Sequence, residues 1–304
     1  MNIARRVYGR PYLLLAVAAL GWGGNAVAGR LGVGHVSPMA IVTLRWLGVV
    51  LVLAVVARRH VGADWAVLKS RWPYVFAMGA LGYTAFNALF YWAAHHTSAV
   101  NMGVIQAITP ALVMAGSLAA YSTPIRPFQV LGLVATLVGV VVVTSRGDME
   151  VLRQFAFNIG DVGIVVASLF YSGYTVALRR RPAVAPLAFF SAMAFAAFLT
   201  SLPLLAYEIA AGAVLWPTPR GWALILFIAL MPSLTCQLLY MRGVELIGPG
   251  RAGLFMNLIP VVAALLAVAI LGETIAPYHA VALGFVLGGI WLAERGRPGE
   301  GRAT

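Results

Sequence analysis

Aromatic, amide and hydroxyl side chains recur at intervals of three or four residues inside four strongly apolar stretches of the sequence. At that spacing the members of each set lie on one face of a helix. The four sets are Trp22 and Asn25; Tyr83, Asn87 and Tyr91; Tyr171 and Tyr174; and Gln237 and Tyr240. Polar groups within apolar sequence are costly unless they face one another or water. A hydrogen bond between helices would satisfy any one of them, but the four sets together predict a shared cavity.

The chemistry that these side chains offer is the binding of a small organic solute. Aromatic faces attract apolar and cationic groups, and amides bind amino or carboxylate groups. An amino acid or aromatic metabolite fits this set, whereas a phosphate or nucleotide sugar would need several buried bases. Arg45 is the one base inside an apolar stretch. We expect it to hold helix-end carbonyls as a structural partner.

Two prolines, Pro110 and Pro260, lie near the middle of apolar stretches. Proline lacks an N–H and clashes with the preceding turn, so each helix should kink. The carbonyls four residues earlier, at Gln106 and Met256, lose their usual partners, which makes both residues candidate solute contacts. Helices broken at matching positions in two halves of a protein indicate a binding site near the middle of a membrane, although a kink can also serve packing alone.

Acidic residues are absent from the centres of the apolar stretches, and Asp161 and Glu208 lie near their ends. Proton-coupled carriers commonly place an acid within the membrane, so we predict facilitated diffusion or weak coupling. We expect His95 and His96 to be solvated loop residues. The sequence shows no cluster of histidine and acid at depth and no serine beside a base. It therefore predicts a protein that is not an enzyme and needs no cofactor or metal.

Ten apolar stretches must position these residues. The chain is 62% hydrophobic and 10% charged, whereas soluble domains carry about 25% charged residues. A helix needs about 20 mostly apolar residues to cross a bilayer. The predicted spans are 11–31, 37–57, 73–94, 98–121, 126–145, 157–178, 184–207, 219–241, 248–271 and 277–293. The sequence thus predicts an all-α integral membrane protein of ten transmembrane helices, with connections too short for a soluble domain.

Basic residues fall mostly on one side of these spans. With the N-terminus inside, 16 Lys and Arg residues lie on the inner side, and the outer side has Arg30, Arg146, Arg153 and Arg220. The positive-inside rule then places both termini in the cytoplasm. The net charge of +12 is therefore an orientation signal, and we expect no nucleic-acid partner. We expect a multi-pass protein of a bacterial inner membrane.

The two halves of the sequence match at a nearly constant offset. A shift of 150 residues places Pro110 on Pro260, and a shift of 149 places Arg30 on Arg179. Five spans is an odd number, so the second half enters the membrane from the opposite side. We predict two five-helix repeats, residues 1–150 and 151–304, inverted with respect to each other around a central cavity. Such halves can exchange inward-open and outward-open packings, which is transport by alternating access.

Several motifs extend over both halves. They are Leu20-Gly21-Trp22-Gly23-Gly24-Asn25, Arg45, the run from Ala99 to Pro110, Pro260, Leu271-Gly272-Glu273, and Gly284 to Gly289. The set resembles the drug/metabolite transporter superfamily, specifically its EamA-type ten-helix exporters, and most closely the exporters of aromatic amino acids and metabolites. The resemblance implies ten helices around a cavity and export of amino acids or related metabolites. The first half departs from the second by having Ser122-Thr123 in place of Gly272-Glu273.

Other functions fit the same pattern. The chain could be a multidrug or other metabolite carrier of that superfamily, or a membrane scaffold that transports nothing. Gly284 and Gly288 form a GxxxG pair that permits close helix contact, either inside the protein or in a dimer. Because ten helices complete the inverted pair, we expect a functional monomer whose partners are a small-molecule substrate and the lipid bilayer.

Overall fold

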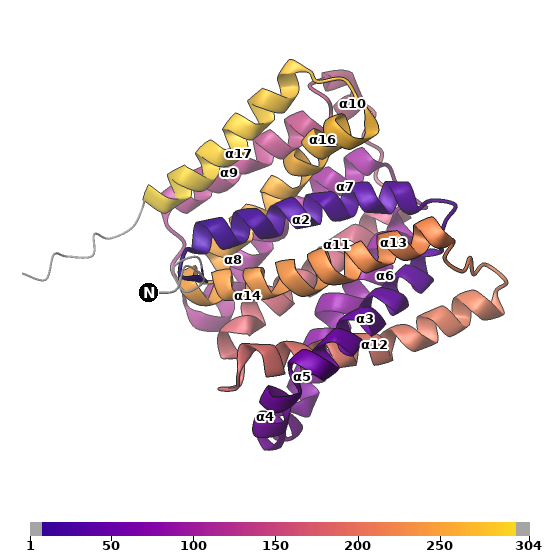
Figure 1. Cartoon of the computed structure of the whole chain (residues 1–304). Helices are drawn as coiled ribbons and strands as arrows, with labels where there is room; N and C mark the ends of the chain where they lie inside the picture. The colour runs from indigo at the N-terminus through magenta and orange to yellow at the C-terminus, as the bar shows by residue number, and fades with distance from the viewer. Residues whose placement is uncertain (1–7, 296–304) are drawn as a thin grey trace, which may run out of the picture.

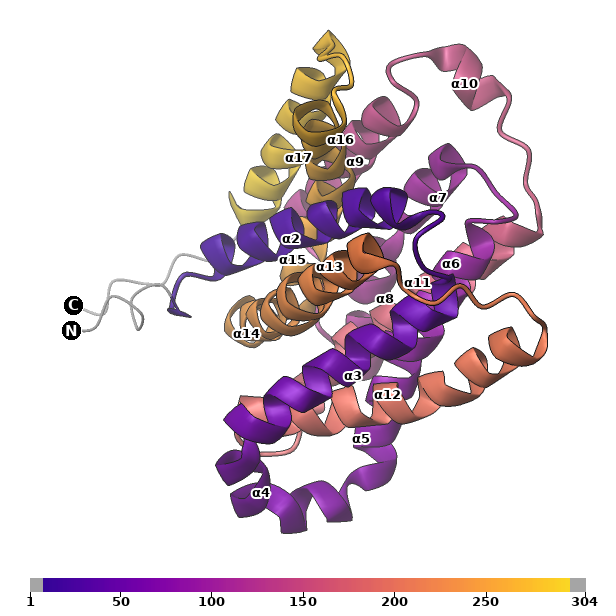
Figure 2. The ribbon, with the colours of Figure 1, turned by 45° about the vertical axis from the view of Figure 1, so that its right-hand side comes forward.

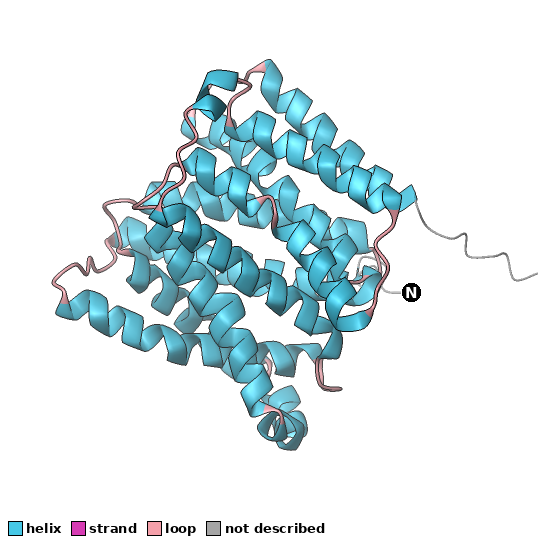
Figure 3. Ribbon diagram, turned by 180° about the vertical axis from the view of Figure 1, so that it is seen from behind, coloured by secondary structure: helices cyan, strands magenta, loops and turns pink. Residues whose placement is uncertain are grey.

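The structure, a computed structural model, describes residues 8–295 and is all-helical over that range (Figures 1 and 3). Both termini, together with Arg5, Arg6, Arg297 and Arg302, lie outside the described residues. The elements are α2 (Pro11–Gly32), α3 (Pro38–Val56), α4 (Arg58–Ser70), α5 (Trp72–Gly79), η1 (Ala80–Ala85), α6 (Phe86–Ala93), α7 (Ala99–Gln106), α8 (Thr109–Tyr121), α9 (Pro127–Thr144), α10 (Met149–Arg153), α11 (Ile159–Ala177), η2 (Leu178–Arg180), α12 (Pro186–Ala210), α13 (Pro219–Ile228), η3 (Ala229–Thr235), α14 (Cys236–Ile247), α15 (Pro249–Leu254), η4 (Phe255–Asn257), α16 (Leu258–Leu271) and α17 (Pro277–Arg295).

Eight of the helical bodies in the described range are long and apolar enough to cross a membrane. They are α2, α3, α7 with α8, α9, α11 with η2, α12, α13 through α14, and α15 through α16. Two further bodies, α5 through α6 and α17, are of similar length but carry more polar and aromatic residues. The all-helical membrane fold is therefore confirmed, and the crossing of the membrane by these last two bodies stays a prediction.

Proline marks where many of these helices begin. It is the first residue of α2, α3, α9, α12, α13, α15 and α17. At that position the missing N–H has no intrahelical partner to lose, and the fixed φ of proline suits a helix. The combination of a proline and about 20 apolar residues explains why the predicted and observed spans agree to within a few residues, except that the span predicted to end at 241 continues to Ile247.

Interruptions occur at matching places in the two halves. The π-helical segments η1 and η3 begin at Ala80 and Ala229, which are 149 residues apart. The break between α7 and α8 likewise corresponds to η4, and Pro110 and Pro260 lie in the first turns that follow. The Thr109 hydroxyl donates to the Gln106 carbonyl, 2.6 Å away, and so satisfies the acceptor that Pro110 leaves without an N–H.

Helices α9 and α17 lie side by side at one edge of the molecule (Figures 1 and 2). A Cβ on Gly132 would lie 2.4 Å from the Gly289 carbonyl oxygen, and a Cβ on Gly289 would lie 2.6 Å from that of Gly132. The close contact therefore uses these two glycines. Gly284 and Gly288, the GxxxG pair, face open space instead, so the pair makes no contact inside the protein.

Carboxylates bind both ends of α12, one to the start of α3 and the other to α4. Glu208, near the end of α12, accepts hydrogen bonds from the Ser37 hydroxyl (2.6 Å) and the Ala40 N–H (3.2 Å) at the start of α3. Asp64 in α4 accepts from the N–H of Ala185, just before α12 (2.8 Å). Helix α4 falls within residues 58–72, where the sequence predicted only a connection. It lies at the lower edge of the molecule (Figure 2).

Candidate functional site

A central cavity of about 670 Å³ lies among the helices. Helices α2, α3, α6, α7, α11, α14 and segment η3 contribute to its walls. Nine of the eleven solute contacts predicted from the sequence line it: Trp22, Asn25, Tyr83, Asn87, Tyr91, Gln106, Tyr171, Gln237 and Met256. These residues come from six segments that are far apart in the sequence, so the fold brings the separate polar sets into one space.

Arg45 is buried against this cavity and is 4% exposed. Its Nε donates to the Ser233 hydroxyl (2.8 Å), and its Nη1 donates to the Asn87 amide oxygen (3.1 Å). The expectation that Arg45 holds helix-end carbonyls is therefore wrong. Its partners are neutral side chains, and in residues 8–295 no carboxylate lies within ion-pair distance of it. The cavity wall thus carries a buried positive charge.

Aromatic rings form much of the remaining wall. The Trp22 and Tyr171 rings meet edge to face at a centroid distance of 6.3 Å, and Phe86 lies 5.0 Å from Tyr171. The Trp22 indole N–H donates to the Pro232 carbonyl (3.0 Å), which fixes its ring plane. Such rings give a solute a rigid apolar surface.

Three buried polar atoms on wall residues have no hydrogen-bond partner among the described residues: the Asn25 amide oxygen, the Tyr171 hydroxyl and the Trp46 indole N–H. Leaving such a group unpaired costs roughly 1–3 kcal/mol. A solute or water that reached these atoms would supply the missing hydrogen bonds.

Tyr174 and Tyr240, the other two predicted contacts, do not line the cavity. They lie in a floor beneath it, where the Tyr174 hydroxyl is 3.0 Å from the Tyr83 hydroxyl and accepts from the Gln237 amide, also at 3.0 Å. The Tyr240 hydroxyl donates to the Met256 sulfur at 3.7 Å. Their hydroxyl groups are therefore used to hold helices together.

The two prolines do not line the cavity either. Pro110 and Pro260 lie in the first turns of α8 and α16, beyond the helix breaks. Gln106 and Met256, whose carbonyls the prolines leave without their usual donor, do line it. The prolines thus act through the backbone and not as contacts.

The structure also adds wall residues that the sequence analysis did not select. They include Ile41, Trp46, Phe86, Phe90, Met102, Pro232 and Ser233. Most are apolar side chains that look the same in the sequence whether they face lipid or a cavity. His95 is an exposed turn residue, as expected, and it also belongs to the cavity lining. At one end of the cavity, near His95, the lining includes the connecting residues 33–37, 94–95 and 213–215. These connections form the mouth of the cavity.

The apolar spans, the matching interruptions in the two halves and a solute-sized internal cavity define a multi-pass membrane carrier. The family model described as the EamA-like transporter family matches the chain twice, at residues 9–145 and 158–294. The chain belongs to this family of membrane transporters, which confirms the resemblance to EamA-type transporters. The match is to the family as a whole and does not distinguish exporters of aromatic amino acids within it.

Relatives cover nearly the whole chain. The uncharacterized transporter YyaM of Bacillus subtilis (strain 168) is 24% identical over 93% of each chain. The uncharacterized transporter YwfM of the same organism is 27% identical over 87% of each chain. A crystal structure at 21% identity superimposes with a TM-score of 0.77 over 93% of this chain and 96% of the other, so the fold is shared. The two Bacillus subtilis relatives are named as transporters without a substrate.

Proposed function

We propose that this transporter exports amino acids, aromatic ones included, or related small metabolites across a bacterial inner membrane by alternating access. The observation that carries the proposal is Arg45, a buried guanidinium that faces a solute-sized cavity and has only neutral partners. A buried charge without a counter-ion is costly. The carboxylate of an amino acid would neutralise it and form charge-assisted hydrogen bonds with it.

The rest of the wall suits the rest of an amino acid. The unpaired oxygens of Asn25 and Tyr171 can accept hydrogen bonds from an ammonium group. Trp22, Phe86 and Tyr171 offer ring faces to an apolar or aromatic side chain. A cationic drug would leave Arg45 without a partner and add a second positive charge, so a multidrug carrier is the weaker alternative.

The proposed cycle uses the two ends of the cavity. The charge distribution of the sequence supports cytoplasmic termini. With that orientation, the mouth at 33–37, 94–95 and 213–215 faces the outer side and the tyrosine floor faces the cytoplasm. Two inverted repeats, residues 1–150 and 151–304, would exchange this outward-open packing for an inward-open one. One chain supplies both repeats, so we propose a functional monomer.

The buried acids Asp161 and Glu208 form hydrogen bonds at helix ends and do not belong to the cavity wall. Asp161 accepts from the Thr97 hydroxyl and the Asn101 amide, and Glu208 binds the start of α3. Neither acid lines the cavity, which supports transport without strong proton coupling. Uptake into proteoliposomes with and without a pH gradient tests this. Accumulation of solute driven by the gradient would contradict it.

Counterflow in proteoliposomes tests the substrate class. Liposomes that contain purified protein are loaded in turn with unlabelled amino acids, a cationic drug or a sugar nucleotide, and uptake of the labelled counterpart is measured. We expect counterflow with amino acids, strongest for aromatic ones, and none with the sugar nucleotide. Counterflow with the cationic drug alone would favour the multidrug alternative, and no counterflow with any compound would favour a scaffold.

A further inference from the structure

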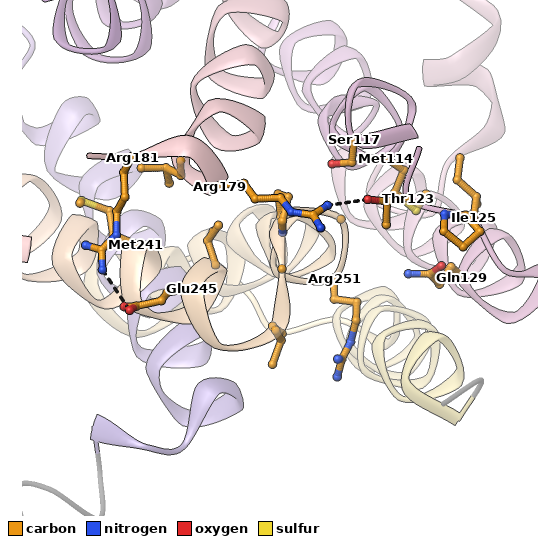
Figure 4. Close-up of a pocket in the computed structure, with 17 residues that line it drawn as sticks. Met114, Ser117, Thr123, Ile125, Gln129, Arg179, Arg181, Met241, Glu245 and Arg251 are labelled. Atoms are coloured by element: carbon orange, nitrogen blue, oxygen red, sulfur yellow. Dashed lines mark hydrogen bonds and ion pairs between the residues drawn. The ribbon is translucent and has the colours of Figure 1, made fainter. Parts of the chain in front are cut away.

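A second cavity, of about 390 Å³, lies near the opposite ends of the helices from the mouth of the central cavity (Figure 4). The end of α8, the start of α9, η2, α14 and the start of α15 surround it. Three arginines line this second cavity: Arg179, Arg181 and Arg251. The charge distribution of the sequence places this end on the cytoplasmic side.

Two of the three arginines have acidic partners. Arg181 pairs with Glu245 at 2.9 Å, and Arg251 pairs with Glu294. Arg179 differs, because its Nη1 donates to the neutral Thr123 hydroxyl at 2.7 Å, and its guanidinium lies 4.8 Å from the centre of the Tyr121 ring. In the described part of the chain, no carboxylate lies within ion-pair distance of Arg179.

In the other repeat, the arginine equivalent to Arg179 forms an ion pair with an acid. Arg30 pairs with Glu273 at 2.9 Å. The offset of 149 places Arg30 on Arg179, and the offset of 150 places Thr123 on Glu273. The two contacts are therefore equivalent, and only the Arg30 contact contains its own counter-ion.

The residues just before Thr123 and Glu273 also have similar backbone conformations. Ser122 has a φ of 51° and Gly272 has a φ of 72°, so both residues are left-handed and direct the chain in the same way. The acid is thus missing beside Arg179 because of one side chain, and not because the fold differs. Threonine is smaller than glutamate and uncharged. It therefore leaves space beside Arg179, and the positive charge of Arg179 can pair with an acidic group from outside the chain.

A buried hydroxyl nearby lacks a partner. Ser117 lines the second cavity, is 3% exposed, and its Oγ has no hydrogen bond to the described residues. Figure 4 shows Ser117, Thr123 and Arg179 close together around this space. Two hydroxyls and one guanidinium are a suitable donor set for an oxyanion.

We propose that the second cavity binds a small oxyanion, a carboxylate or phosphate group, through Arg179, Thr123 and Ser117. The oxyanion can come from a soluble metabolite or from the headgroup of an anionic lipid, because basic pockets between membrane helices on the cytoplasmic side also bind headgroups. The site is separate from the central cavity, and its occupancy does not depend on what the central cavity transports.

The test uses the full-length protein in a non-ionic detergent. Inorganic phosphate is added against chloride at constant ionic strength, and the thermal unfolding midpoint is followed. Native mass spectrometry measures retention of phosphatidylglycerol against phosphatidylcholine. The variants are Thr123→Glu, which restores the acid found in the other repeat, and Arg179→Gln. Arg30→Gln is the matched control, since Arg30 already has its acid.

We expect each of the two variants to weaken binding of the preferred oxyanion at least tenfold, and Arg30→Gln to leave it unchanged. A phosphate-dependent rise in the unfolding midpoint identifies a soluble ligand. Selective retention of phosphatidylglycerol without that rise identifies a lipid headgroup. Thr123 is exposed, so Thr123→Glu remains informative if Arg179→Gln does not fold. No binding by the unmodified protein, or equal binding by it and Thr123→Glu, would overturn the proposal.

Discussion

At the scale of single residues, charge and backbone conformation determine what each position can do. Arg45 is a cation in the interior whose hydrogen-bond partners, Ser233 and Asn87, are neutral. Two polar oxygens, on Asn25 and Tyr171, are buried and unpaired beside the same cavity. Ser122 is a residue other than glycine in a left-handed conformation. Each of these features costs free energy in the isolated protein, and the proposed solute would offset the first two of them.

Arg45→Gln should weaken transport of amino acids by raising KM about tenfold or more. A hydrogen bond to a charged group contributes roughly 1.5–3 kcal/mol, and glutamine keeps a donor but loses the charge. The measurement is the KM for counterflow in proteoliposomes. Arg220→Gln, at an exposed arginine near the start of α13, is the control and should leave KM unchanged. An unaltered KM in Arg45→Gln would remove Arg45 from the proposed carboxylate site.

Ser122→Gly should stabilise the protein by about 0.5–1 kcal/mol. A left-handed conformation costs about 1–2 kcal/mol for residues with a Cβ, and the greater freedom of glycine in the unfolded chain offsets part of the gain. The unfolding midpoint in detergent should therefore rise. The reciprocal change at the equivalent position, Gly272→Ser, should lower it. A lower midpoint for Ser122→Gly would show that the serine side chain has a stabilising contact.

At the scale of elements, repeat-related helices carry repeat-related irregularities. The π-helical segments η1 and η3 are 149 residues apart, and the break after α7 corresponds to η4. Irregular backbone at membrane depth is tolerated where it is buried in protein or lines a cavity. Here η1 supplies Tyr83, η3 supplies Ser233 and η4 supplies Met256 to the central cavity. The regular helices α9 and α17 lie outside this arrangement and pack on each other through glycine.

Gly132→Ala should destabilise the contact between α9 and α17 by about 1–3 kcal/mol. The new methyl group would lie 2.4 Å from the Gly289 carbonyl oxygen, so the two backbones would have to separate. Gly288→Ala is the matched control, because its methyl group meets open space. The unfolding midpoint in detergent should fall for the first variant only. Equal effects of the two variants would contradict the contact.

At the scale of the whole molecule, a layer of tyrosines separates the central cavity from the second cavity. Tyr83 lines the central cavity, and its hydroxyl lies 3.0 Å from that of Tyr174 and 4.0 Å from the sulfur of Met241. Met241 in turn lines the second cavity. Opening this layer would join the two spaces, which makes it the barrier in the proposed exchange between outward-open and inward-open packings.

Tyr174→Phe should make the central cavity more accessible from the cytoplasmic side of this layer. The change removes the hydroxyl that contacts Tyr83 and Gln237, and each hydrogen bond contributes roughly 0.5–1.5 kcal/mol. A cysteine introduced at Met102, which lines the central cavity beyond this layer, reports this as a several-fold faster reaction with a membrane-impermeant thiol reagent in inside-out vesicles.

The background for this experiment is Cys236→Ala, which removes the one native cysteine. A matched cysteine at Val33, which is exposed at the mouth, should not react faster in right-side-out vesicles. An unchanged rate at position 102 would contradict a barrier role for Tyr174.

The sequence by itself determined membrane residence, the helical class and the approximate ends of the spans. These follow from local properties: a run of apolar residues of spanning length and a proline that suits the first turn. The offset between the halves likewise indicated matching breaks near Pro110 and Pro260. Spacing within a helix also showed which polar residues share a face, so nine of eleven proposed contacts line one cavity.

Only the tertiary structure decided in which direction each helix face points and which residues it contacts. It placed Tyr174 and Tyr240 in the floor, gave Arg45 side-chain partners, and brought His95 to the mouth. It also joined Arg179 to Thr123 and Arg30 to Glu273. The rotation of a helix about its axis and the meeting of distant segments depend on packing between helices, and this packing leaves no periodic signal in the sequence.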